Sequence, residues 1–325
     1  MFGGLVVAQT TFDPTTIGVG ARALGMGKAY AAIAEDGDTV FSNPAGLGEI
    51  DSFKFTSMSG LIMEDVNYTV LGGVYPLGQK SAIGIGYLMA GVGGITLRDV
   101  GGNYLGRANF ENNVILLAYG KKLSDKFSLG ITSKYFYQAG SETGNGDGTG
   151  LNFDLGILQS GTGWFSSGLI IKNILSNNKI TYSTGEEEKL PQEIKVGTRM
   201  FLLGENFESA MNFPVEVALA IDADLSLSGS KPTATHTGIE VTPSSFLTLR
   251  TGIDQDIEPG SLQNNYTFGL TLRYVGLGFH YAYHTYNQAN NGSTNFFSLS
   301  FDERGWAPEG PPDIFIGSTN QPILQ

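Results

Sequence analysis

After residue 51 the sequence divides into fourteen segments of about ten residues in which apolar side chains alternate with small or polar ones. This period of two predicts β-strands, and the turn residues between the segments predict antiparallel connections. About ten residues is also the length of a tilted strand that crosses a bilayer. The predicted strands are residues 52–61, 66–75, 81–90, 111–121, 126–137, 150–159, 164–173, 191–202, 213–224, 234–241, 246–254, 264–274, 277–286 and 294–302.

The connections between these strands alternate in length. On one side they average about 11 residues and on the other about 5. Outer-membrane barrels show this asymmetry, with short turns on the periplasmic side and longer loops outside. The sequence therefore predicts an all-β protein, a transmembrane antiparallel β-barrel of about 14 strands over residues 51–302.

Each predicted strand has an apolar and a polar face. In residues 126–137, for example, Leu129 and Ile131 alternate with Gly130 and Thr132. Periodicity alone does not say which face is inside, because a soluble barrel would turn the apolar face inward.

Charged residues on the polar faces help to decide. They come from seven strands, and a dry core would desolvate them at a large cost. We therefore predict that the polar faces line a wet or plugged lumen and that the apolar faces contact outer-membrane lipids. The predicted lumen network consists of Glu193, Lys195, Arg199, Glu216, Asp222, Arg250 and Arg273. The three charges on strand 191–202 should face Glu216 and Asp222.

Aromatic residues are expected where a barrel meets the lipid headgroups. The predicted strand ends carry Tyr75, Tyr137, Trp164, Tyr274 and Tyr286. Aromatic residues also favour strands in general, so a chance position at strand ends is the alternative.

Two histidines share one strand. His280 and His284 both fall on its inward face, but they are too far apart to share one metal ion.

The composition narrows the classes of function. The chain has no Cys and three His, which excludes disulfides, thiolate zinc sites and a cysteine nucleophile and leaves little imidazole for catalysis. A formal net charge of -12 has the wrong sign for binding a phosphate backbone, so nucleic acid is not an expected partner. No apolar run is long enough for a transmembrane helix. We expect no enzymatic activity, metal or cofactor.

The first eight residues, Met1–Ala8, resemble the end of an apolar signal peptide with a small-residue cleavage site before Gln9. A short apolar first strand and a misplaced start codon are the alternatives. The signal-peptide interpretation predicts an exported protein.

Residues 17–49 are rich in Gly and Ala and lack the period of two. We predict a short helix over about residues 28–35 and a bend at Asn43, because Pro44 disfavours helical geometry in the preceding residue. The segment GARALGMGKAYAAIAEDGDTVFSNPAGLGEI, residues 20–50, resembles the N-terminal signature of the FadL-like outer-membrane superfamily, especially its PorV/PorQ-like branch, with Asn43-Pro44-Ala45 as the hallmark. Later stretches that fit this branch are NVILLAYGKKLSDKFSLGITSKYFY (113–137), LNFDLGIL (151–158), GLIIKNIL (168–175), LPQEIKVGTRM (190–200) and TFGLTLRY (267–274).

The resemblance implies a fourteen-stranded barrel whose residues 9–50 fold into the lumen as a hatch, with Asn43, Pro44 and Ala45 as its hinge. A bend that merely links the hatch to the first strand is the alternative. In FadL-like transporters, hydrophobic ligands enter from outside, cross the hatch and leave through a lateral gap beside a kinked third strand.

Further candidate residues follow from this likeness. Gly84 and Gly86 of the third strand, with Gly91 beyond it, would weaken pairing at a lateral gap, although close packing against the hatch is the alternative. The loop 91–110 would be a lid or capture surface. An apolar pocket between hatch and wall would be bounded by Leu24, Met26, Tyr30 and Ile33.

Two functions fit these features. The first is passage of small hydrophobic molecules past the hatch, across the outer membrane of a diderm bacterium. The second is a non-transporting envelope scaffold, or a barrel associated with type IX secretion as in the PorV-like branch, that binds another envelope or secreted protein. We favour the first. Residues 303–325 are predicted to be an extended periplasmic tail, either a disordered end or a docking segment that uses Ile314, Phe315 and Ile316.

Overall fold

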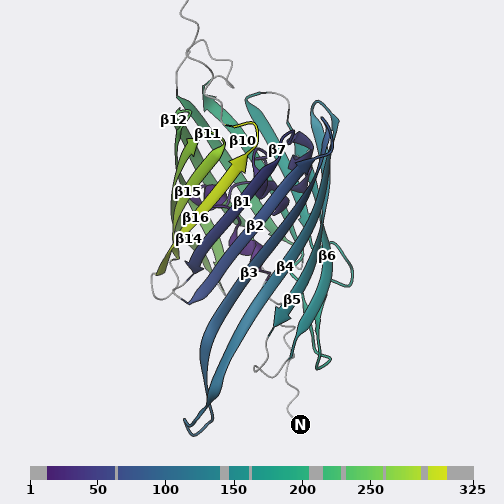
Figure 1. The fold of residues 1–325 in the computed structure, drawn as a ribbon, viewed down its shortest axis with the longest axis vertical. Coiled ribbons are helices and arrows are strands. Elements are labelled where there is room, and N and C mark those ends of the chain that lie inside the picture. The colour runs from purple at the N-terminus through teal and green to yellow at the C-terminus, as the bar shows by residue number, and fades with distance from the viewer. Residues whose placement is uncertain are drawn as a thin grey trace, which may run out of the picture.

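Fourteen strands of the described chain form a closed antiparallel β-barrel, as the sequence predicted (Figure 1). The computed structural model describes residues 13–62, 65–139, 146–160, 163–204, 215–227, 232–258, 261–286 and 292–305. The barrel strands are β1 (Lys54–Ile62), β2 (Val66–Pro76), β3 (Ser81–Arg98), β4 (Tyr104–Ser124), β5 (Phe127–Ala139), β6 (Gly148–Gln159), β7 (Phe165–Lys172), β10 (Glu193–Leu203), β11 (Glu216–Ser226), β12 (Ala234–Ser244), β13 (Leu247–Glu258), β14 (Ser261–Tyr274), β15 (Leu277–Tyr286) and β16 (Gly292–Asp302).

The barrel is closed because its first and last strands pair with each other. β1 pairs with β16 from Lys54↔Asp302 to Gly60↔Phe296, and β5 pairs with β6 along its length. A closed sheet leaves no row of unpaired backbone groups facing lipid. A small hairpin, β8 (Lys179–Tyr182) and β9 (Glu187–Lys189), lies in the chain between β7 and β10, and its β8 pairs with the start of β6.

The two ends of the barrel differ. At the turn end, residues 125–126, 245–246 and 275–276 connect neighbouring strands. At the hairpin end, β3 and β4 continue together beyond the other strands (Figure 1).

The β3–β4 hairpin corrects the prediction that residues 91–110 are a loop. The two strands stay paired to Arg98↔Tyr104, with register shifts between Val92 and Ile95 and between Leu97 and Arg98. The glycines of this stretch lie at or near bulges, where the backbone ladder continues without side-chain alternation. The period of two in the sequence therefore did not predict these strand residues, although their backbones pair.

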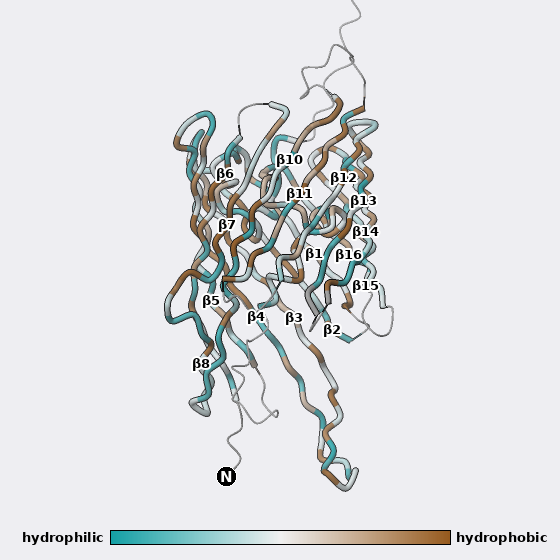
Figure 2. The backbone as a smooth tube through the Cα atoms, turned by 180° about the vertical axis from the view of Figure 1, so that it is seen from behind, coloured by the Kyte–Doolittle hydropathy of each residue, from teal (hydrophilic) through white to brown (hydrophobic). Residues whose placement is uncertain are grey.

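The two faces of the wall divide as the sequence predicted. Leu129 and Ile131 of β5 are exposed on the outside, whereas Thr132 and Lys134 of the same strand are buried. Figure 2 shows the resulting alternation of hydrophobic and hydrophilic residues along the strands. An apolar exterior over a polar interior is the arrangement of a barrel that stands in lipid.

The helices in the described part of the chain are all short. None of them is long and apolar enough to cross a membrane.

The N-terminal segment, residues 13–50, packs against the inner face of the wall (Figure 1). It contains 3-10 helices η1 (Pro14–Ile17), η2 (Gly37–Val40) and η3 (Pro44–Glu49) and one α-helix, α1 (Ala21–Gly25). α1 contacts β13, β14 and β15, and η3 contacts β4, β5 and β6. The helix predicted over residues 28–35 is wrong, because Gly27 and Lys28 have φ of 61° and 64°, which ends the helical geometry.

Candidate functional site

Three glycines of the wall form the surface on which Asn43, Pro44 and Ala45 lie. Gly120 of β4 pairs with Gly130 of β5, which pairs with Gly156 of β6. A Cβ at Gly130 would lie 2.2 Å from the carbonyl carbon of Pro44, and one at Gly156 would lie 2.2 Å from Asn43 Oδ1. Only glycine lets the two backbones approach this closely.

The buried side chain of Asn43 joins the N-terminal segment to the wall. Its Nδ2 donates to the carbonyl oxygens of Ala31, at 2.8 Å, and of Ile157 in β6, at 3.1 Å. Its Oδ1 accepts a bond of 3.1 Å from the Ala45 N–H and so caps η3. The amide thus bonds to backbone groups on both sides of the interface. Its role as a hinge stays a prediction.

The candidate lateral-gap residues lie in a continuous ladder. Residues 82–91 of β3 pair with both β2 and β4, so this structure has no gap at Gly84 or Gly86. A Cβ at Gly84 would lie 2.4 Å from Val40, and one at Gly86 would lie 2.6 Å from Phe41. Gly91 lies against Phe110 and Glu111 of β4. Close packing against the N-terminal segment accounts for Gly84 and Gly86.

Arg22 of α1 is bonded to three carboxylates in the lumen. Its Nε and Nη2 donate to Glu240 of β12 at 3.0 and 2.8 Å, Nη2 donates to Glu35 at 2.8 Å, and Nη1 donates to Asp36 at 3.2 Å. Two wall arginines extend the network: Arg250 donates to Glu240 at 2.5 Å, and Arg199 donates to Glu35. The network therefore spans the segment and the wall.

The predicted pair of Lys195 with Asp222 is present, whereas Glu193 and Arg199 pair with other residues than predicted. Lys195 lies 3.7 Å from Asp222 and 2.9 Å from Asp224, but Glu193 lies 4.0 Å from Lys172. Arg199 pairs with Glu35 and Glu240.

Glu216, Arg273 and Asp222 of the predicted lumen network have further neighbours. Glu216 lies beside Gly204 at the turn end, and Arg273 donates to Thr248 at 2.8 Å. Asp222 accepts the backbone N–H groups of Tyr30 and Ala31 at 2.8 and 2.9 Å. Much of the charge on the wall thus binds the N-terminal segment instead of the neighbouring strand.

Burial and neighbouring charge set the pKa values of two carboxyls in the N-terminal segment. Burial would raise the pKa of Glu35, but Arg199 and Arg22 outweigh it and lower that pKa to about 2. Burial and the adjacent Asp36 raise the pKa of Asp38 to about 7. Glu35 is therefore held ionised beside its arginines.

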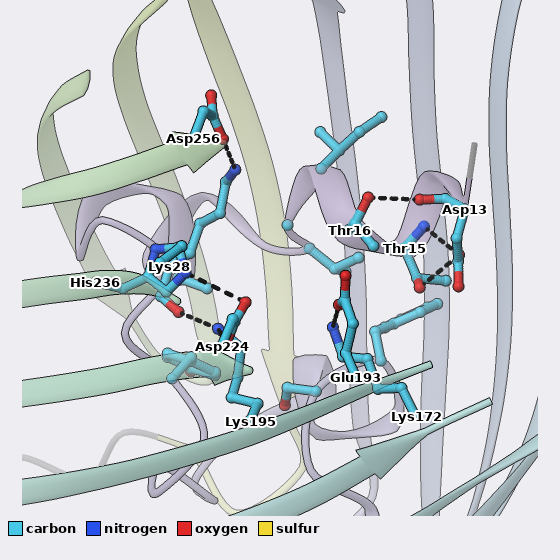
Figure 3. Close-up of a pocket in the computed structure, with 18 of the residues that line it drawn as sticks. Asp13, Thr15, Thr16, Lys28, Lys172, Glu193, Lys195, Asp224, His236 and Asp256 are labelled. Carbon is cyan, nitrogen blue, oxygen red and sulfur yellow. Dashed lines mark hydrogen bonds and ion pairs between the residues drawn. The ribbon is translucent and has the colours of Figure 1, made fainter. Parts of the chain in front are cut away.

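A cavity of about 590 Å³ lies between the N-terminal segment and the wall at the hairpin end of the barrel (Figure 3). One part of its lining is apolar, with Ile17, Val19, Ile62 and Val66. The other part is charged, and Figure 3 shows Lys28 pointing toward Asp256. The charged and imidazole residues of the lining are Asp13, Lys28, Lys172, Glu193, Lys195, Asp224, His236 and Asp256.

This cavity is not the predicted apolar pocket. Of the four residues proposed for that pocket, Tyr30 lines the cavity, whereas Leu24, Met26 and Ile33 are fully buried in packed clusters. Met26 and Ile33 cluster with the small Ala220 of β11. The apolar side chains of the segment are used to pack it against the wall.

Sequence reasoning missed several residues of the site. Glu240 and Asp254 were detectable by position, since both lie on the inward face of predicted strands. Asp254 accepts from Lys28 at 2.7 Å and from His284 at 2.9 Å. Arg22 and Glu35 carried no signal, because their partners are distant in sequence.

Two predictions lie outside the described residues. They are the signal peptide, residues 1–8, and most of the tail, from residue 306 onward.

Solved structures share this fold at low sequence identity. The chain resembles the Pseudomonas putida toluene transporter TodX, with 12% identity, a TM-score of 0.59 and coverage of 91% of this chain and 99% of that one. The CymD monoaromatic hydrocarbon channel gives 12% identity, a TM-score of 0.60 and coverage of 90% and 98%. A Pseudomonas aeruginosa FadL homologue gives 11% identity, a TM-score of 0.56 and coverage of 87% of this chain and 98% of that one.

These likenesses establish the fold. No family model and no curated protein matches the chain. At such identities the similarity is one of barrel architecture, and residue roles must come from this chain.

Proposed function

We propose that this protein is an outer-membrane channel of a diderm bacterium that passes small hydrophobic molecules, with residues 13–50 as a hatch across its lumen. The observation that carries the proposal is the cavity of about 590 Å³ above a tightly packed N-terminal segment, inside a wall with an apolar exterior. A cavity of this size holds a small organic molecule. The shared fold with hydrocarbon channels supports the same function.

In this proposal Asn43, Pro44 and Ala45 hold the closed hatch against the glycines of β4, β5 and β6. The cavity takes the molecule at the hairpin end, and the network around Arg22 holds the hatch in place beneath it. The hairpin end is the outer one, since long connections face outward in such barrels. A separate part of the proposal is that the chain belongs to the PorV-like branch, which the motif in residues 20–50 supports.

Uptake by whole cells tests transport. Expression in a diderm host that lacks hydrocarbon channels is expected to give faster, saturable uptake of radiolabelled toluene than an empty vector gives. Val66 lines the cavity, so Val66→Trp should fill it and lower uptake toward the vector level. Val196 is exposed on the outside of β10, and Val196→Trp should leave uptake unchanged. Equal uptake with protein and with vector would contradict the proposal.

A scaffold that binds an envelope or secreted protein is the second candidate, and the β3–β4 hairpin favours it. The hairpin extends beyond the barrel (Figure 1). Val100, Tyr104 and Leu105, at the turn between β3 and β4, are exposed. For this function, one envelope protein should copurify in equal amount, and replacing the tip, residues 99–105, by a short turn should remove it.

A further inference from the structure

Tyr286 lines the cavity, and its buried hydroxyl group has no hydrogen-bond partner among the described residues. Tyr286 is 6% exposed, and its ring lies 4.4 Å from that of His284. The sequence suggested that Tyr286 belongs to the headgroup belt, but it lies on the same face of β15 as His284 and points inward. A buried hydroxyl without a partner is costly unless a ligand or water satisfies it.

The apolar part of the cavity lies on the same side as Tyr286. Val19, Ile62 and Tyr286 belong to one buried cluster, and Ile17 and Val66 pack against it. Tyr286 also lies near enough to Lys28, Asp254 and Asp256 for their charges to act on its hydroxyl. Its hydroxyl therefore stands where the apolar and polar parts of the lining meet.

The lysines of the lining are already paired with carboxylates of the lining or just behind it. Lys28 lies 2.7 Å from Asp254, Lys195 lies 2.9 Å from Asp224, and Lys172 lies 4.0 Å from Glu193. A ligand with a single charge would have to compete for one member of such a pair, and the member with the same charge as the ligand would repel it. A pure hydrocarbon would displace water from the polar part without replacing its hydrogen bonds.

We propose that this cavity binds a neutral, hydroxyl-bearing amphiphile, an alcohol or a phenol, in preference to a hydrocarbon or a carboxylate. This inference rests on the proposed transport function and names its substrate class. The apolar body of the ligand lies against Ile17, Val19, Ile62 and Val66, and its hydroxyl exchanges a hydrogen bond with Tyr286.

Three probes with the same methylated ring test the proposal: p-cresol, toluene and 4-methylbenzoate. Their binding to the full protein in lipid nanodiscs is measured by equilibrium dialysis, with empty nanodiscs subtracted. We expect p-cresol to bind about tenfold more tightly than toluene, the effect of one buried hydrogen bond. We expect 4-methylbenzoate to bind most weakly. Toluene that binds as tightly as p-cresol, or 4-methylbenzoate that binds best, would overturn the proposal.

Tyr286→Phe removes the hydroxyl and keeps the ring. It should weaken p-cresol binding about tenfold and leave toluene binding unchanged. Tyr266 of β14 is 51% exposed on the outside, so Tyr266→Phe is the matched control and should change neither. An equal effect of Tyr286→Phe on both probes, or no effect, would overturn the role of the hydroxyl. If Tyr286→Phe fails to assemble, the ranking of the three probes on the natural protein still decides.

The uptake assay separates this inference from the proposed function. If toluene and p-cresol are taken up equally and bind equally, transport stands and the preference for a hydroxyl fails. If neither binds and neither is taken up above the vector level, both proposals fail.

Discussion

Arg22→Met is expected to release the N-terminal segment from the wall while the barrel stays closed. Arg22 is 4% exposed and donates to Glu240, Glu35 and Asp36. Removing one partner of a buried ion pair usually costs about 3–5 kcal/mol. The lower end of that range applies here, because Glu240 keeps its bond to Arg250. Backbone amides of residues 20–50 should exchange hydrogen about 100-fold faster, with the barrel strands still protected.

Hydrogen exchange followed by mass spectrometry in nanodiscs measures this difference peptide by peptide. Arg304→Met is the matched control, because Arg304 and its partner Asp51 are 62% and 51% exposed. An exposed pair contributes at most about 1 kcal/mol, so the control should leave exchange in residues 20–50 unchanged. The same protection in Arg22→Met and in the natural protein would refute a tethering role for this network.

Gly130→Ala is expected to push η3 away from the wall. The added methyl would lie 2.2 Å from the Pro44 carbonyl carbon and 2.4 Å from the Ala45 nitrogen, both of which are backbone atoms that cannot rotate away. Overpacking of this kind costs about 1–3 kcal/mol, and more where backbone must move. Protection from exchange should fall first in residues 43–49, where the Asn43 cap and its bond to Ile157 break.

Gly73→Ala provides the control within the same sheet. A Cβ at Gly73 has Lys54 O as its nearest neighbour, at 4.0 Å, so the methyl has room. This variant should match the natural protein in exchange and in assembly. If Gly130→Ala also matched it, close approach at the glycines would not be what holds the Asn43-Pro44-Ala45 bend.

The barrel could be predicted because its constraints are local. Leu129 and Ile131 lie on the outer face and Thr132 lies on the inner face. Successive side chains of a strand meet opposite environments, so its sequence shows a period of two. Prediction of strands from this period failed where glycines interrupt the alternation of apolar and polar side chains. Residues 92–98 pair with β4 through two register shifts, and the pairing depends on the backbone instead of on side chains.

The interior of the barrel could not be predicted from such patterns. The bond from Arg22 to Glu240 joins residues 218 positions apart, and its formation depends on how the N-terminal segment lies against the whole wall. Tyr286 is different, because the inward assignment of His284 already implied that a residue two positions along the strand points inward. A position at a strand end does not by itself place an aromatic side chain in the headgroup belt, because the period of two decides the face on which it lies.

Planar-bilayer recording from the intact natural protein tests most directly whether residues 13–50 close the lumen. Packed apolar clusters, the Arg22 network and glycine contacts hold this segment against the wall across the barrel interior. We therefore expect that insertion of the protein gives no large, steady ion conductance. A steady, ohmic conductance of the size expected from an open fourteen-stranded barrel would contradict it.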